Sequence, residues 1–292
     1  MVLRARSDYS LGVLLLIASA VTFSTAGLFT KGVAAGAWAV IFWRGFFAAA
    51  FTLGWIVSQG TVKRNFSNLG LSGWAVVLIG ALGTAAFIPA FKLTSIANVS
   101  LIYAVAPMIA AVLAWLAIGE RITLRTLLGA ICALLGVCII VSGSLGQVSL
   151  LGDALALVMT VAMATIMVIY RKYPMTPGAG PSVLQSLLLL PPSFFLGAPF
   201  QTEPVEILVL AAFGLLFAIA SVSLAEGSKR VPSGQTALLS ALETPLAPVF
   251  AFIIFTEVPN AATITGGALV LLAVFASIRK DAGEGDQPGG RR

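Results

Sequence analysis

Hydrophobic residues occur in ten long runs along the chain, and the short segments between them carry most of the charged side chains. The runs lie at about residues 11–30, 37–57, 71–91, 97–118, 124–142, 151–170, 182–200, 205–225, 235–256 and 261–278. Polar side chains do not recur along them with the period of a half-buried strand or of an amphipathic surface helix. A helix needs about 20 apolar residues to cross the hydrocarbon core of a bilayer. The pattern predicts an all-α integral membrane protein with ten transmembrane helices.

Two of the runs share one pattern. Residues 106–121 read APMIAAVLAWLAIGER and residues 244–259 read TPLAPVFAFIIFTEVP, so that a proline near the start precedes a glutamate by 12–13 residues in both. The offset between the copies is about 137–140 residues, which spans five of the predicted helices. A repeat with an odd number of crossings inserts its second copy upside down. We therefore expect inverted five-helix repeats at 1–145 and 146–280, followed by a disordered cytoplasmic tail at 281–292, and we expect Glu120 and Glu257 on opposite sides of the membrane.

The composition agrees with a membrane protein, since 59% of the 292 residues are hydrophobic and only 10% are charged. So few charges could not cover the surface of a soluble protein of this length. The chain has no histidine, which excludes most zinc sites and every catalytic arrangement that depends on a Ser-His or Cys-His pair. A phosphate-binding G-x-x-x-x-G-K-[ST] motif is also absent from the sequence. No cofactor or metal is expected.

The net charge of +6 is distributed along the chain in a way that indicates membrane orientation and not nucleic-acid binding. If the N-terminus is cytoplasmic, 14 of the 17 Lys and Arg residues fall in segments on the inside, and only Lys31 and Lys92 lie outside. This asymmetry predicts that both termini face the cytoplasm, as in a bacterial inner-membrane protein. Ala18-Ser19-Ala20 resembles a signal-peptide cleavage site, but the apolar run continues to Phe29, which favours a first membrane helix.

Two ionisable residues, Arg44 and Glu243, lie deep within predicted helices. Ionisable groups at such depth are rare and usually functional. They are expected at similar depth, where they could pair directly, through water, or with the two charges of a zwitterionic substrate. A structural role, in which each bonds to neighbouring helices, is the alternative for both.

Other side chains could form the walls of a cavity. Phe87, Phe91, Tyr103 and Met163 lie inside predicted spans and offer aromatic or flexible apolar surface, and Ser240 offers a hydroxyl. Ordinary helix packing is the alternative for each of them, and most hydroxyls in spans bond back to their own helix.

Prolines predict where the helices are irregular. Pro107 and Pro245 occupy corresponding positions in the two copies, and Pro248 follows closely. Each would free the carbonyl four residues earlier, on Tyr103, Ala241 and Thr244, for a substrate or water. In contrast, Gly119 suits the left-handed end of a helix that reaches cytoplasmic water at Glu120.

The sequences IGERI at 118–122, LETP at 242–245 and FWRGFF at 42–47 resemble the EamA module of the drug/metabolite transporter superfamily. The resemblance covers the whole chain as two modules and is greatest to the YddG-type exporters of aromatic amino acids. Residues 106–107 lack the glutamate that precedes the family's proline, Thr244 separates Glu243 from Pro245, and Thr256 replaces the usual glycine. The resemblance implies packing between the fifth and tenth helices and a central substrate path.

We therefore expect a secondary transporter that exports small amphipathic metabolites, amino acids including aromatic ones, by alternating access. Its partners are then the small-molecule substrate and the lipid bilayer, with proton coupling left open. Uptake or transport of a nucleotide sugar is the first alternative, although such anions need several basic groups at depth and Arg44 is the only one. A membrane-embedded enzyme or a channel is less well supported.

Overall fold

The computed structural model describes residues 2–67, 69–142, 149–255 and 261–278, and every regular element within these ranges is a helix. The predicted all-helical class is therefore confirmed for the described part of the chain. Glu257 and the predicted tail at 281–292 lie outside the described residues.

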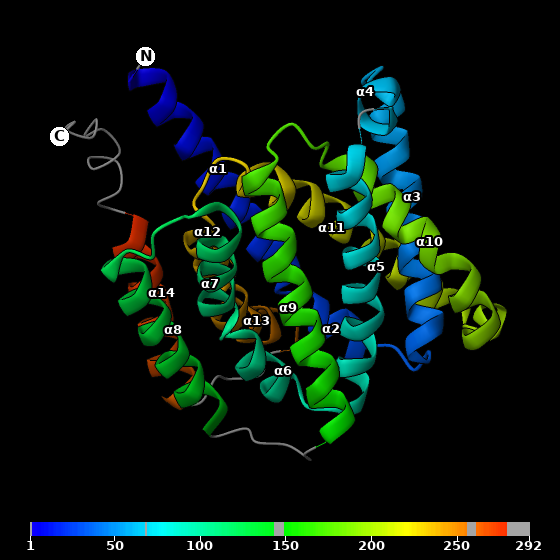
Figure 1. The fold of residues 1–292 in the computed structure, drawn as a ribbon. Helices are drawn as coiled ribbons and strands as arrows, with labels where there is room; N and C mark the ends of the chain where they lie inside the picture. Colours follow the sequence, from blue (N-terminus) through cyan, green and yellow to red (C-terminus); the bar gives the residue numbers. More distant parts are fainter. Residues whose placement is uncertain (1, 68, 143–148, 256–260, 279–292) are drawn as a thin grey trace.

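The helices follow one another closely (Figure 1). In chain order they are α1 (Val2–Phe23), α2 (Ala26–Lys31), α3 (Ala37–Ser58), α4 (Val62–Phe66), α5 (Gly70–Leu93), α6 (Ile96–Tyr103), α7 (Ala106–Ile118), α8 (Leu124–Ser142), α9 (Leu150–Lys172), α10 (Ala179–Gly197), the short 3₁₀ helix η1 (Pro199–Gln201), α11 (Pro204–Ser228), α12 (Ser233–Ser240), α13 (Glu243–Phe255) and α14 (Ala261–Ile278).

Seven segments of the described chain are long and apolar enough to cross a membrane. They are Ser7–Lys31, Ala37–Ser58, Gly70–Leu93, Asn98–Ile118, Leu150–Lys172, Ala179–Gly197 and Pro204–Ser228. Shorter apolar helices cover Leu124–Ile140 and Ala261–Ala276. The predicted run at 235–256 divides between α12 and α13 and is not among the seven. Seven crossings are thus supported by length and composition, and the number ten stays a prediction.

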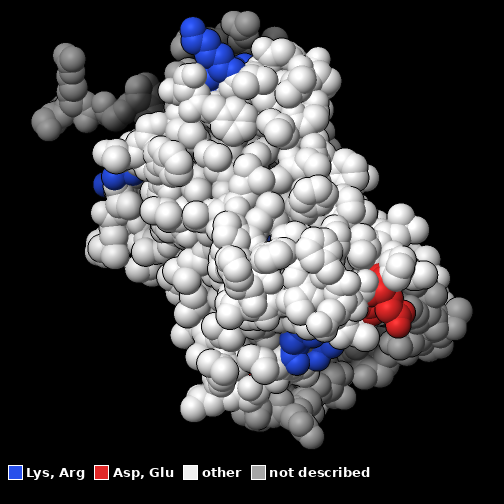
Figure 2. All heavy atoms as spheres, turned by 90° about the vertical axis from the view of Figure 1, so that its right-hand side faces the viewer, with Lys and Arg blue, Asp and Glu red and all other residues white. Residues whose placement is uncertain are grey.

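Large apolar side chains cover the outside of the bundle. Leu71, Met175 and Phe195 are 91%, 91% and 82% exposed, and many leucines and phenylalanines of the long helices are similarly open. Figure 2 shows one flank of the molecule with almost no charged side chains except near its upper and lower parts. A surface of this kind is suited to lipid and not to water.

Two helices of the bundle are interrupted close to Pro107 and Pro245, the positions where the sequence predicted irregular helices. The chain breaks at Ala104–Val105, between α6 and α7, and at Ala241–Leu242, between α12 and α13. Pro107 and Pro245 lie in the first turn of the helix that follows each break. A proline is tolerated in the first turn because its missing N–H has no helical partner there. Breaks therefore lie next to both Pro107 and Pro245, and each proline begins the helix that follows.

The carbonyl of Ala241, which was expected to be free, accepts a hydrogen bond from the Thr244 backbone N–H at 3.2 Å. This prediction was wrong because the chain turns tightly after α12 instead of continuing as a kinked helix. Pro248 was also predicted to interrupt a helix, but α13 continues through it from Glu243 to Phe255.

Helices that are distant in the sequence pack side by side. The most extensive contacts join α8 with α14, α3 with α10, α5 with α9, and α1 with α11. At the crossing of α8 and α14, a Cβ atom on Gly136 would come within 2.7 Å of the Gly266 carbonyl oxygen. The two backbones can approach this closely only because both residues lack a side chain. The expected packing of the fifth and tenth apolar runs is confirmed.

One end of the bundle gathers basic residues, and we call it the basic end. Arg171 donates to the Lys229 carbonyl oxygen there, and Lys172, Arg230 and Arg64 lie near the same helix ends. This end includes the start of α1 and the short helix α4, at the top of Figure 1. Here α7 packs against α12. Gly119 ends α7 in the left-handed conformation, with φ of 69°, as expected.

Glu120 joins three helices at the basic end. Its Oε2 accepts a hydrogen bond from the Ser233 backbone N–H at 3.2 Å, where α12 begins. Its Oε1 lies 3.5 Å from the Arg171 Nε, at the end of α9. Glu120, the first glutamate of the repeated pattern, therefore connects α7 to α9 and α12.

Lys229 is a further charged residue at the basic end. Burial lowers the pKa of its ammonium group, and the hydrogen bond to Glu226 opposes this effect.

Candidate binding cavity

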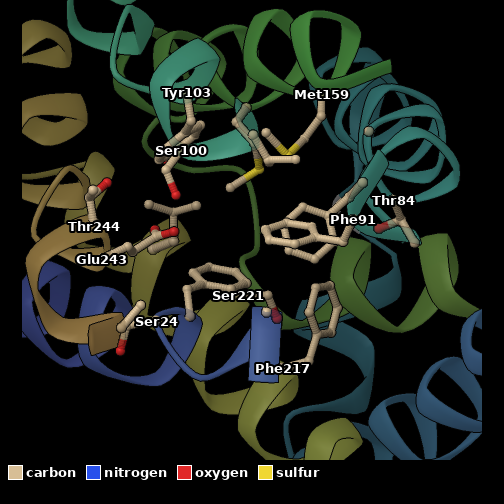
Figure 3. A pocket seen from close by; sticks show the side chains of 18 of the residues that line it. Ser24, Thr84, Phe91, Ser100, Tyr103, Met159, Phe217, Ser221, Glu243 and Thr244 are labelled. Carbon is tan, nitrogen blue, oxygen red and sulfur yellow. The ribbon is translucent and has the colours of Figure 1, made fainter. Parts of the chain in front are cut away.

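A cavity of about 480 Å³ lies at the centre of the bundle and is lined by residues from both halves of the chain. Its volume falls in the range of small-molecule sites, roughly 300–1,000 Å³. Most of the lining is apolar, and among the described residues Arg44 and Glu243 are its only acidic or basic members. Figure 3 shows the side chains that surround it, with Glu243, Thr244 and Ser24 on one side and Phe91, Thr84, Ser221 and Phe217 on the other.

Arg44 is held by aromatic rings and not by a carboxylate. Its side chain is 2% exposed, and its Cζ atom lies 4.0 Å from the centroid of the Phe217 ring and 5.6 Å from that of Phe213. Such cation–π contacts are most favourable away from water. The buried Nε of Arg44 has no hydrogen-bond partner. The guanidinium is thus positioned beside the cavity with donor capacity that the protein does not use.

Glu243 is the first residue of α13 and follows directly on the second helix break. A carboxylate at a helix N-terminus is favoured by the backbone dipoles. It is half-buried and lines the cavity, and it makes no ion pair with Arg44. Of the arrangements considered for these two residues, direct pairing is therefore not the one observed.

Aromatic and methionine side chains form much of the wall. Phe87 and Phe91 lie one turn apart on α5 with their ring centroids 4.8 Å apart. Tyr103, at the end of α6, is 7% exposed, and its buried hydroxyl lies beside Ser240. Met163 lines the cavity together with Met159 on the same helix. These groups give the cavity an apolar surface that can adapt to rings of different shape.

Of the side chains predicted to bind substrate, six line this one cavity: Arg44, Phe87, Phe91, Tyr103, Met163 and Glu243. Ser240 does not line it, because its hydroxyl points back along α12 and donates to the Thr236 carbonyl at 3.1 Å. Pro248 lines the cavity, whereas Pro107 and Pro245 are buried among helices and do not.

Several cavity residues were missed by the sequence reasoning. Gln185 on α10, Thr84 on α5 and Phe217 on α11 all face the cavity. Gln185 carried a usable signal, since an amide within an apolar run is nearly as unusual as a charge. Phe217 carried none, because the chain has 18 phenylalanines and nothing in its spacing singles this one out.

Two hydroxyls also connect the helices on this side. Ser182 of α10 and Ser221 of α11 are hydrogen-bonded at 2.7 Å, and both line the cavity. This bond fixes the relative position of α10 and α11 beside Arg44. The wall that holds the guanidinium is therefore tied together across three helices.

Comparison with known proteins agrees with this architecture. A solved crystal structure of another protein has a similar fold, with a TM-score of 0.77 at 19% identity over 92% of this chain and 96% of that one. YyaM of Bacillus subtilis (strain 168), described as an uncharacterized transporter, is 25% identical over 251 residues, which cover 80% of this chain and 82% of that protein. The profile of the EamA-like transporter family matches residues 10–142 and 150–279. These two matches cover most of the chain and repeat the two units, so the protein belongs to the EamA-like transporter family.

Proposed function

We propose that this transporter exports small amphipathic metabolites, amino acids including aromatic ones, across the bacterial cytoplasmic membrane. The observation that carries the proposal is the central cavity, in which one cation and one carboxylate face an otherwise apolar, aromatic lining. A zwitterion with a ring is complementary to such a lining. Arg44, Phe87, Phe91, Tyr103, Met163 and Glu243 are its proposed contacts. The outward direction rests on the resemblance to exporters.

The mechanism we propose is alternating access between two inverted five-helix repeats, with ten crossings and both termini in the cytoplasm. The two family matches, at 10–142 and 150–279, support two repeats. So does the pairing of helices, because α1 packs on α11 as α9 packs on α5, and these pairs are equivalent under the repeat. A reporter fused to the C-terminus that is active only outside the cytoplasm would contradict the orientation.

The packing around the two breaks supports a cavity closed at the basic end. There α7 packs against α12, whereas their counterparts α6 and α13 make no comparable contact within the described residues and both line the cavity. If the basic end is cytoplasmic, this conformation is the one that releases substrate outward. If α6 packed against α13 and α7 separated from α12, the cavity would open toward the cytoplasm instead.

The cavity offers little support for a nucleotide sugar, since Arg44 is the only basic residue among its described lining residues. A pyrophosphate group would favour several basic residues. Proton coupling would involve Glu243, the only carboxylate among the same lining residues. A counterflow rate that is independent of pH between 5 and 8 would indicate facilitated transport instead.

Counterflow in proteoliposomes tests the proposal. Vesicles loaded with unlabelled phenylalanine should accumulate external labelled phenylalanine in proportion to the protein present, and Glu243→Gln should lose most of this activity. Empty vesicles and a panel of alanine, a uridine sugar nucleotide and an organic cation serve as controls. Accumulation of the sugar nucleotide but not of phenylalanine would overturn the proposal.

A further inference from the structure

We propose that Gln185 acts with Arg44 to bind the carboxylate of the transported molecule and so orients the substrate within the cavity. This inference rests on the proposed function, because it names the group that the cavity recognises at one of its sides. It adds a specificity-determining residue that neither the sequence pattern nor the family match assigns.

The first observation is the condition of the Gln185 side chain. It is 8% exposed, it lines the cavity, and it makes no hydrogen bond within the described residues. Its amide atoms stay reachable from the cavity, and a ligand that covered them without a hydrogen bond would cost about 1–3 kcal/mol. A buried amide that faces a cavity without a partner is therefore suited to a partner that arrives with the substrate.

The second observation fixes which part of the amide is available. A Cβ atom on Gly80 would overlap Oε1 of Gln185, so the amide oxygen rests against the bare Cα of α5. Cα–H groups can form weak hydrogen bonds to such an oxygen. The Nε2 group, with its two N–H donors, is then the part left for a ligand.

The third observation places Gln185 level with Arg44. The helices α3 and α10 pack along their length, and the Cβ position of Gly45 lies 3.6 Å from the Ser186 carbonyl oxygen. Arg44 and Gln185 are the residues next to that contact in their respective helices. Both line the same cavity, and Nε of Arg44 also has no partner.

These donors select the ligand chemistry. Guanidinium groups have only donors, and the free end of Gln185 adds two more, so this wall is complementary to an acceptor with negative charge. Charge-assisted bonds of this kind are about twice as strong as neutral ones. Glu243 lies on the side of the cavity opposite Phe217, whose ring holds Arg44 (Figure 3). A bound amino acid would direct its carboxylate to Arg44 and Gln185, and its ring or amine toward Glu243 and Tyr103.

The test uses four ligands that share a phenyl ring. L-phenylalanine and phenylacetate carry a carboxylate, whereas L-phenylalaninamide and 2-phenylethylamine do not. Binding to the full-length protein in detergent is measured as the ligand-dependent rise in melting temperature, followed by tryptophan fluorescence. We expect Gln185→Leu to weaken binding of both carboxylates about tenfold, and binding of the other two less than threefold, because only the carboxylates lose a charge-assisted bond. Gln185→Glu should weaken the carboxylates further by repulsion.

A second pair of variants distinguishes a loss of binding from a loss of folding. Gly80→Ala would displace the Gln185 amide and should reproduce the loss of carboxylate binding. Added to Gln185→Leu in a double variant, it should weaken carboxylate binding little further. Gly45→Ala, whose Cβ would meet only ordinary contacts, is the matched control and should bind like the wild type.

The outcomes separate this inference from the proposed function. Unchanged carboxylate binding in both Gln185 variants would overturn the inference and leave phenylalanine transport intact. Wild-type protein that binds phenylacetate but not phenylalanine would contradict amino-acid transport, and a loss of phenylacetate binding in Gln185→Leu would still support the inference. Wild-type protein that binds neither carboxylate would overturn it.

Discussion

The two helix breaks have the same position in the two matched units of the chain, yet they differ in charge and in packing. The first, between α6 and α7, is followed by Ala106 and Pro107 and carries no ionisable side chain. The second, between α12 and α13, is followed at once by Glu243, which faces the cavity. Related backbone geometry therefore serves two purposes. One break gives a helix end that packs at the basic end, and the other presents a carboxylate to the cavity.

The helices around the two breaks also differ in packing. At the basic end, α7 and α12 contact each other and are joined through Glu120. Their counterparts α6 and α13 instead contribute Ser100, Tyr103 and Glu243 to the cavity. A repeat protein with identical halves would have no reason to favour either side. Within the described residues, the contact between α7 and α12 therefore has no counterpart of similar extent between α6 and α13.

The largest expected effect is at the charged break. Glu243→Gln keeps the shape of the side chain and removes its charge, so counterflow of phenylalanine should fall roughly tenfold to a hundredfold, which corresponds to the loss of one charge-assisted bond. The melting temperature should change by only a few degrees. Thr244→Val, at the neighbouring lining residue, is the control and should keep most of the activity. Wild-type rates in Glu243→Gln would mean that the carboxylate serves packing alone.

Tyr103 tests the uncharged break. Tyr103→Ala removes ring area worth about 1–3 kcal/mol of apolar contact, so the half-saturating concentration should rise about tenfold for phenylalanine and much less for alanine. Tyr103→Phe should keep most of the activity, because it retains the ring that lines the cavity. An equal loss for both substrates would indicate a structural role for the ring.

Much of the fold could be predicted because the bilayer requires long apolar helices, and polar side chains are few in the runs that contain α1, α3, α5, α9, α10 and α11. The breaks were harder to place. Proline at residues 107 and 245 signals irregularity, but a kink in a continuous helix and the first turn of a new helix have the same local sequence. Tertiary packing of α7 and α12 decides between them, and it cannot be read from spacing.

In the candidate site, the residues that could be predicted were those whose burial costs the most free energy. Arg44 and Glu243 could be found because ionisable groups are costly in a membrane and therefore have a reason to be there. Gln185 has a smaller cost and was overlooked, and Ser240 was wrongly placed at the cavity because a hydroxyl can satisfy itself on its own helix. Sequence reasoning is thus most reliable for the groups that are most expensive to bury.

Glu120 tests whether the packing at the basic end biases the conformation. Glu120→Ala removes the acceptor for the Ser233 N–H and the partner of Arg171, a loss of roughly 1 kcal/mol for partly exposed groups. The ratio of closed to open basic end should fall about fivefold, measured by spin-label distances between the ends of α7 and α12. Asp153→Asn, which affects a hydrogen bond from Thr94 near the opposite end of α9, should leave that distance distribution unchanged.

The smallest expected effect is at Pro107. Its position in the first turn of α7 means that Pro107→Ala restores an N–H where none is needed, so the melting temperature and transport should change little. Pro248→Ala, inside α13, restores a helical hydrogen bond and should stabilise the protein by more, up to about 3 kcal/mol. Equal effects of the two substitutions would contradict this difference between a proline in the first turn of a helix and one in its interior.

The contact between Gly136 and Gly266 has a consequence for how such a protein can evolve. After a duplication, two copies of a gene segment usually drift apart freely, yet here each copy supplies one side of a backbone-to-backbone contact that admits no side chain. A substitution at either glycine would bring a side chain against the backbone of the other copy, so selection on the two positions is coupled. In a library of random variants, we therefore expect these two positions to retain glycine together, while the lipid-facing residues around them diversify independently.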